Sequence, residues 1–120
     1  MREIEVVEEG KIYNITLTRG DTLIEPISIY KEVNGEDVEY TPLEGDSIRF
    51  AMKKKYADSD DDVVLNINIP TDTMLLTILP EHTKPLTMGM KYVYDIQLTD
   101  ANGNVDTFIS GKFKVGNEVI

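Results

Sequence analysis

The sequence contains no cysteine and no tryptophan, and His82 is its single histidine. Without cysteine the chain cannot form disulfides, thiolate nucleophiles or the common Cys-based zinc sites. A lone histidine has no second histidine with which to share a metal, and the sequence places no partners for a catalytic triad beside it. A glycine-rich phosphate-binding loop is also missing. We therefore expect a protein that is not an enzyme and that carries no cofactor.

Long apolar runs and a basic N-terminus are absent too, so the sequence predicts neither a membrane span nor a signal peptide, and we expect synthesis in the cytoplasm. The formal net charge is −10, from 22 acidic and 12 basic residues. Such a surface repels phosphate backbones and anionic lipids, which argues against nucleic acid and membranes as partners. The run Lys53–Lys55 is interpreted as a solvated strand end rather than a docking patch, because consecutive strand residues point to opposite faces.

Alternating apolar and polar residues predict about eight short strands, joined by turn signals at the spacing typical of sandwiches and barrels. Asn34-Gly35 is one of these signals and predicts a hairpin-type turn. The predicted strands span residues 3–8, 13–18, 23–30, 47–53, 63–69, 75–79, 90–99 and 107–115. Since each strand has one apolar face, the pattern indicates an all-β chain in which two antiparallel sheets pack face to face. With 120 residues the chain can bury a real core, and we expect residues 1–120 to form one domain.

The stretch Met88–Gly116 is predicted to be a long hairpin against which the other strands pack. Its first arm places Tyr92 and Tyr94 on the apolar face, and its second arm places Gly111 there. Between the arms, Asn102-Gly103 favours the positive φ angles of a tight turn. A glycine inside a strand allows a bulky side chain or another backbone to approach, and we expect Gly111 to accommodate one of the two tyrosines.

An acidic loop between two predicted strands has the beginning of a calcium-binding pattern. Asp58, Asp60 and Asp62 stand at alternate positions, as the first three oxygen ligands of an EF-hand loop do. The sixth position is Val63 instead of glycine, and the twelfth is Ile69 instead of a bidentate glutamate. We therefore interpret the segment as a solvated acidic loop and predict no metal site, with the three aspartates as weak candidates.

Three aromatic residues are candidates for contact with a partner. Phe108 falls on the outward phase of its strand, and Tyr30 and Tyr56 stand at strand ends. Exposed rings can stack on sugars, so a carbohydrate-binding or cell-surface module is one interpretation. The alternative is that a neighbouring loop or subunit covers these rings.

Two parts of the chain together resemble a known family. The first is Thr18-Arg19-Gly20-Asp21-Thr22 with the following strand, and the second comprises residues 91–98, Asn102-Gly103 and residues 107–115. In this order they are similar to the small immunoglobulin-like domains of tailed phages and prophages of Gram-positive bacteria, in particular the N-terminal domain of the phage baseplate upper protein family. Arg19-Gly20-Asp21 also matches the integrin-recognised tripeptide in letters, and we interpret it as a turn that ends a strand.

The resemblance implies an immunoglobulin-like β-sandwich of seven or eight strands. It implies a virion structural or assembly protein of the tail, baseplate, neck or head, made in the host cytoplasm and then part of the virion. Its partners would be other virion proteins, and a homo-oligomer is compatible with the same role. In such a fold Tyr92 or Tyr94 can be the corner tyrosine whose hydroxyl ties the crossing segment Pro80–Thr87 to the sandwich.

Overall fold

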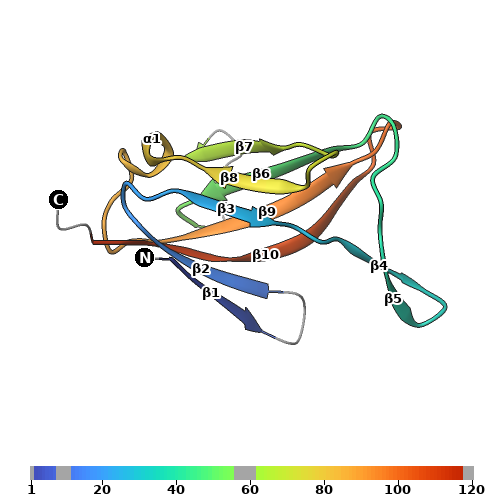
Figure 1. The fold of residues 1–120 in the computed structure, drawn as a ribbon, viewed down its shortest axis with the longest axis horizontal. Helices are drawn as coiled ribbons and strands as arrows, with labels where there is room; N and C mark the ends of the chain where they lie inside the picture. The colour runs from blue at the N-terminus through green and yellow to red at the C-terminus, as the bar shows by residue number, and fades with distance from the viewer. Residues whose placement is uncertain (1, 8–11, 56–61, 118–120) are drawn as a thin grey trace.

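The computed structural model describes residues 2–7, 12–55 and 62–117, and most of these residues lie in strands (Figure 1). At this level the all-β prediction is confirmed. The strands are β1 (Arg2–Val7), β2 (Ile12–Thr18), β3 (Leu23–Pro26), β4 (Tyr30–Val33), β5 (Glu36–Glu39), β6 (Ser47–Lys53), β7 (Leu65–Ile69), β8 (Leu75–Ile78), β9 (Lys91–Thr99) and β10 (Val105–Gly116), and a short helix, α1 (Pro80–Thr83), follows β8. In the part of the chain that is described, no helix is long and apolar enough to span a membrane.

Six strands form one mixed sheet, the main sheet, in the order β1-β2-β10-β9-β6-β7. Most neighbours are antiparallel, but β2 runs parallel to β10 and sets Ile15 beside Phe113. The predicted purely antiparallel arrangement is wrong at this pair. Local alternation of apolar residues predicts strands and their faces, whereas the direction of β10 relative to β2 depends on a connection that spans most of the chain.

A two-stranded sheet of β3 and β8 lies over one face of the main sheet (Figure 1). Its register partners Leu23 and Ile78 are fully buried and belong to the same cluster as the inner face of the main sheet. At the centre of that cluster Phe50 stacks on Tyr94, with 5.1 Å between ring centroids, and meets Phe113 edge-on at 6.3 Å. Each such pair adds about 1 kcal/mol beyond area burial. The two sheets therefore share one core.

A separate hairpin of β4 and β5 projects from the body of the molecule (Figure 1). Asn34 and Gly35 have φ angles of 53° and 81°, as a two-residue type I′ turn requires. Every residue of β5 is exposed. The predicted strand over residues 23–30 is wrong in its second half, because β3 ends at Pro26, which has no N–H to donate. We call β4, the turn and β5, residues 30–39, the hairpin arm.

Candidate functional site

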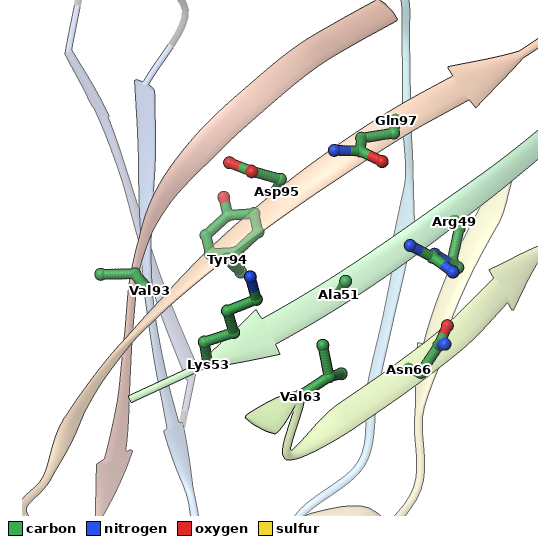
Figure 2. Close-up of a pocket in the computed structure, with 9 residues that line it drawn as sticks. All are labelled: Arg49, Ala51, Lys53, Val63, Asn66, Val93, Tyr94, Asp95 and Gln97. Carbon is green, nitrogen blue, oxygen red and sulfur yellow. The ribbon is translucent and has the colours of Figure 1, made fainter. Parts of the chain in front are cut away.

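The outer face of the main sheet, opposite the core, is hollowed over β6, β7 and β9 (Figure 2). The hollow has a volume of about 330 Å³. Its low point is Ala51, because the register sets this short side chain between Asn66 of β7 and Asp95 of β9. Arg49 and Lys53 project from β6 on either side of Ala51. One short residue surrounded by longer polar ones thus creates the hollow.

The side chains around the hollow carry both hydrogen-bond donors and acceptors. Asn66 and Gln97 offer amides, Asp95 offers a carboxylate, and Arg49 and Lys53 offer cationic groups. Burial raises the pKa of Asp95, and the positive charge of Lys53 opposes that rise. Chemically, the arrangement suits a polar ligand that is held by several hydrogen bonds at once.

Of the three weak metal candidates, the structure places one. Asp62 is exposed, whereas Asp58 and Asp60 lie outside the described residues. Across residues 2–7, 12–55 and 62–117, no group of three or more His, Cys, Asp or Glu side chains is arranged to hold a metal ion. His82 has a local role, since its Nδ1 accepts a hydrogen bond of 2.8 Å from the N–H of Leu79 at the start of α1.

The base of the hairpin arm packs on aromatic rings. Lys31 Nζ lies 4.3 Å from the ring centroid of Tyr40 and 5.8 Å from that of Phe108. Cation–π contacts of this kind contribute about 0.5–1 kcal/mol at exposed sites. The Tyr40 hydroxyl donates to Asp46 Oδ2 at 2.6 Å, and this hydrogen bond raises the pKa of Tyr40. Lys31 is therefore held at the base of the arm rather than at its tip.

The structure describes two of the three aromatic candidates for partner contact. Phe108 lies beside a β-bulge between Thr107 and Ile109, and its ring is half-buried against the core. Alternation predicts that the ring of Phe108 points outward. The bulge changes the phase of the strand, and the ring therefore points only partly outward. Tyr30 begins the hairpin arm and is 39% exposed. Tyr56 lies outside the described residues.

Tyr92 and Tyr94 each use the hydroxyl to tie a distant segment to the main sheet. Tyr92 Oη accepts a hydrogen bond of 3.0 Å from the N–H of Thr87 in the crossing segment, which is the contact expected of a corner tyrosine. Tyr94 Oη donates to the carbonyl oxygen of Tyr13 at 2.5 Å. Gly111 lies against the same carbonyl, because a Cβ at this position would be 2.0 Å from that oxygen and 3.1 Å from Tyr94 Cε2.

The turn between β9 and β10 is longer than the predicted tight turn, and residues 100–104 connect the two strands. Gly103 has a φ of 84°, but Asn102 is not among the residues with positive φ, so that part of the prediction is wrong. Asp100 organises the loop: its Oδ1 accepts hydrogen bonds of 2.9 Å from the N–H groups of both Asn104 and Asn102. These bonds, that from Asn104 foremost, lower the pKa of Asp100.

The Arg-Gly-Asp tripeptide at residues 19–21 forms a turn after β2. Arg19 donates from its N–H to the carbonyl of Gly116 at 3.0 Å and from Nε to that of Lys84 at 2.8 Å. The N–H of Gly20 donates to Thr83 Oγ1 at 2.8 Å. The turn is thus fastened to the end of β10 and to the crossing segment, which agrees with its interpretation as the end of a strand.

Sequence reasoning did not identify Arg49, Asp95 and Gln97 as neighbours around a hollow. Their outward phase is visible in the alternation, but which strands lie side by side is not. One signal was available: Ala51 is a short residue on the outward phase of a strand whose neighbouring outward positions are long and basic.

The chain matches no protein-family model, and no curated protein is significantly similar to it.

Proposed function

We propose that this chain is a non-enzymatic structural or assembly protein of a phage or prophage virion, which acts by docking against other virion proteins. The observation that carries the proposal is the hairpin arm, which leaves the body and exposes apolar side chains. Val33 is 51% exposed and Val38 is 47% exposed. An isolated two-stranded hairpin is marginally stable at best in water, so the arm is best explained as an element that contacts a partner.

The positions of the residues that carry the phage resemblance support the proposal. The two motif segments are far apart in sequence, yet β2 and β10 are neighbours in the main sheet, and the turn at residues 19–21 is bonded to Gly116. Strands β3 and β8 cover the same core from the other side. These positions support the immunoglobulin-like β-sandwich that we propose, with Tyr92 as its corner tyrosine.

The partners that fit this surface are proteins of the tail, baseplate, neck or head, met after synthesis in the host cytoplasm. A net charge of −10 disfavours nucleic acid and anionic membranes. Protein interfaces combine an apolar centre with a polar rim. The arm offers both, because the exposed Val33 and Val38 are accompanied by the exposed carboxylates of Glu36 and Glu39.

The test is a lysogen from which the gene is deleted and then supplied in trans. We expect the wild-type chain to restore intact particles, and Val33→Ser with Val38→Ser to lower the yield by roughly tenfold or more, as removal of interface anchors does. Both side chains are exposed, so circular dichroism should show an unchanged fold. Leu79→Ser with Met88→Ser replaces exposed apolar residues away from the arm and should match wild type.

Two results would count against these proposals separately. Full restoration by the Val33→Ser, Val38→Ser variant would contradict the docking role of the arm. Normal particle yield after deletion of the gene, with no defect in the particles, would contradict the structural role in the virion.

A second function, carbohydrate binding, is favoured by the polar hollow on the outer face. The amide, carboxylate and guanidinium groups around Ala51 match the hydrogen-bonding needs of sugar hydroxyls. On a glycan array we expect a bound glycan to be lost with Arg49→Ala and with Gln97→Ala. Asn68→Ala is the control, since Asn68 of β7 is the register partner of Arg49 of β6 but does not line the hollow. No bound glycan, or equal binding by all three variants, would remove this function.

A further inference from the structure

Basic residues gather on the outer face of the main sheet, although the chain as a whole is strongly acidic. The outward positions of β6, β9 and β10 are those that alternate with buried residues. At these positions stand five of the 12 basic residues, Arg49, Lys53, Lys91, Lys112 and Lys114, and one acidic residue, Asp95. The outward positions of these three strands are therefore positive in a protein whose net charge is −10.

Four of these residues crowd around Val93. The register sets Lys53 of β6 and Lys112 of β10 on either side of Val93, and it pairs Lys91 directly with Lys114. We call these four lysines the basic patch. Neighbouring strands are only about 4.8 Å apart, and like charges directly opposite each other are destabilising. An anionic partner would offset this repulsion.

The hairpin arm carries the opposite charge at its far end. Residues 33–39, which we call the acidic tip, contain Glu36, Asp37 and Glu39, all exposed, and no basic residue. The lysine of the arm, Lys31, lies at its base over two aromatic rings. The tip is therefore acidic throughout, with exposed valines between the carboxylates.

We propose that the acidic tip of one copy docks on the basic patch of a second copy of this chain. The charges of the two surfaces are complementary, which favours encounter and fixes orientation. Both also offer apolar area, from Val33 and Val38 on the tip and from the half-buried Val93 in the patch. The contact would supply the packing that an isolated hairpin lacks, and it would bring the carboxylates of the tip beside the crowded lysines.

The tip and the patch lie at opposite ends of the molecule, so one copy cannot join its own two surfaces. Lys91 begins β9, whereas the base of the arm lies beside Phe108, near the other end of β9 (Figure 1). β9 has 9 residues, so at about 3.3 Å per residue its ends are roughly 26 Å apart. A contact between two different surfaces is head-to-tail, and it repeats until it closes a ring or extends as a filament.

Sedimentation velocity of the whole chain tests this contact. At low ionic strength, and over a range of about 10 to 500 μM, we expect species larger than a dimer to grow with concentration. Roughly 0.5 M salt should weaken the association at least about tenfold, because exposed charges are then screened. Glu36→Lys with Glu39→Lys reverses the tip, from three negative charges to a net of +1. Lys91→Glu with Lys112→Glu and Lys114→Glu reverses the patch, from four positive charges to a net of −2. Either reversal alone should weaken association by roughly 100-fold or more, since like charges then meet.

A mixture of the two reversed variants is the decisive sample. In an equimolar mixture each tip again finds a patch of opposite charge on the other variant, so association should return. The control, Glu44→Lys with Glu81→Lys, makes the same change in net charge as the tip reversal, at exposed positions outside the arm. It should associate at least as well as wild type.

Several outcomes would overturn the proposal. One is a wild-type chain that stays monomeric to about 500 μM at low salt, where even a weak specific contact should register. Others are association that survives either reversal, or a mixture that stays monomeric. Binding to a DNA duplex or to phosphatidylserine vesicles that is lost on patch reversal, without self-association, would assign the patch to a different partner. The contact does not depend on a virion role, which has its own test.

Discussion

Replacing Gly111 with alanine is expected to destabilise the protein more than replacing a typical glycine does. A Cβ at this position would lie 2.0 Å from the carbonyl oxygen of Tyr13 and 2.8 Å from the carbonyl carbon. Backbone atoms cannot rotate aside as the end of a flexible side chain can, so β2 would have to move away from β10. That movement would also disturb the hydrogen bond that Tyr94 donates to the same carbonyl.

The expected loss in the free energy of unfolding is about 3 kcal/mol, the upper part of the usual range for overpacked interiors. The pairing of β2 with β10 is vulnerable, because near Gly111 one of its hydrogen bonds is made by a side chain instead of the backbone. The N–H of Lys112 donates to Asn14 Oδ1 at 3.0 Å. For a domain of this size, such a loss corresponds to a fall in melting temperature of roughly 10 to 15 °C.

Urea unfolding followed by far-ultraviolet circular dichroism measures the difference. Gly35→Ala is the matched control, because Gly35 has a φ of 81° and no atom within 4 Å of an added Cβ. That variant therefore reports only the conformational cost of the left-handed region, about 1 kcal/mol. If Gly111→Ala costs no more than Gly35→Ala, the close approach of β2 to β10 is wrong.

Three further substitutions test individual groups. Tyr94→Phe leaves the Tyr13 carbonyl without its donor and should lower the free energy of unfolding by about 1–2 kcal/mol, so an unchanged urea midpoint would refute that role. The lowered pKa of Asp100 means that its carboxylate stabilises the fold above the ordinary aspartate pKa, and that this contribution is lost as pH falls through the lowered folded pKa. The urea midpoints of wild type and Asp100→Ala should therefore converge as pH falls below the ordinary aspartate pKa, and a gap that stays constant with pH would contradict this role of Asp100. The pKa shift of Asp95 has the opposite sign, because burial raises the pKa. The contribution of Asp95 to stability is therefore present below the ordinary aspartate pKa and is lost as pH rises through the folded pKa. Asp95→Asn should raise the midpoint at neutral pH, and a lower midpoint would count against this assignment.

Two Asn-Gly pairs show what the sequence can predict about turns. Asn34-Gly35 forms a two-residue turn in which both residues have positive φ, as the dipeptide predicts. Asn102-Gly103 is the same dipeptide, yet only Gly103 has a positive φ. The difference comes from Asp100, whose carboxylate accepts hydrogen bonds within a longer loop. The dipeptide predicts that the chain turns, whereas loop length depends on where the strand pairing stops.

Long-range pairing accounts for most of what the sequence could not predict. Alternation places Tyr94 of β9 and Phe113 of β10 on the inner face, and the structure buries both there. Alternation does not predict that β2 runs beside β10 in parallel, which is why a Cβ at Gly111 would meet the backbone of Tyr13. Nor does it predict the bulge at Thr107 to Ile109, where the phase of the strand changes. The hollow around Ala51 depends in the same way on which strands flank β6.

Mass spectrometry of particles purified from an induced host that carries the gene tests the proposed virion role most directly. If the chain is a structural component, its peptides should remain with density-purified particles at a constant ratio to the major capsid protein across preparations. Peptides that are abundant in the lysate but absent from purified particles would contradict the role.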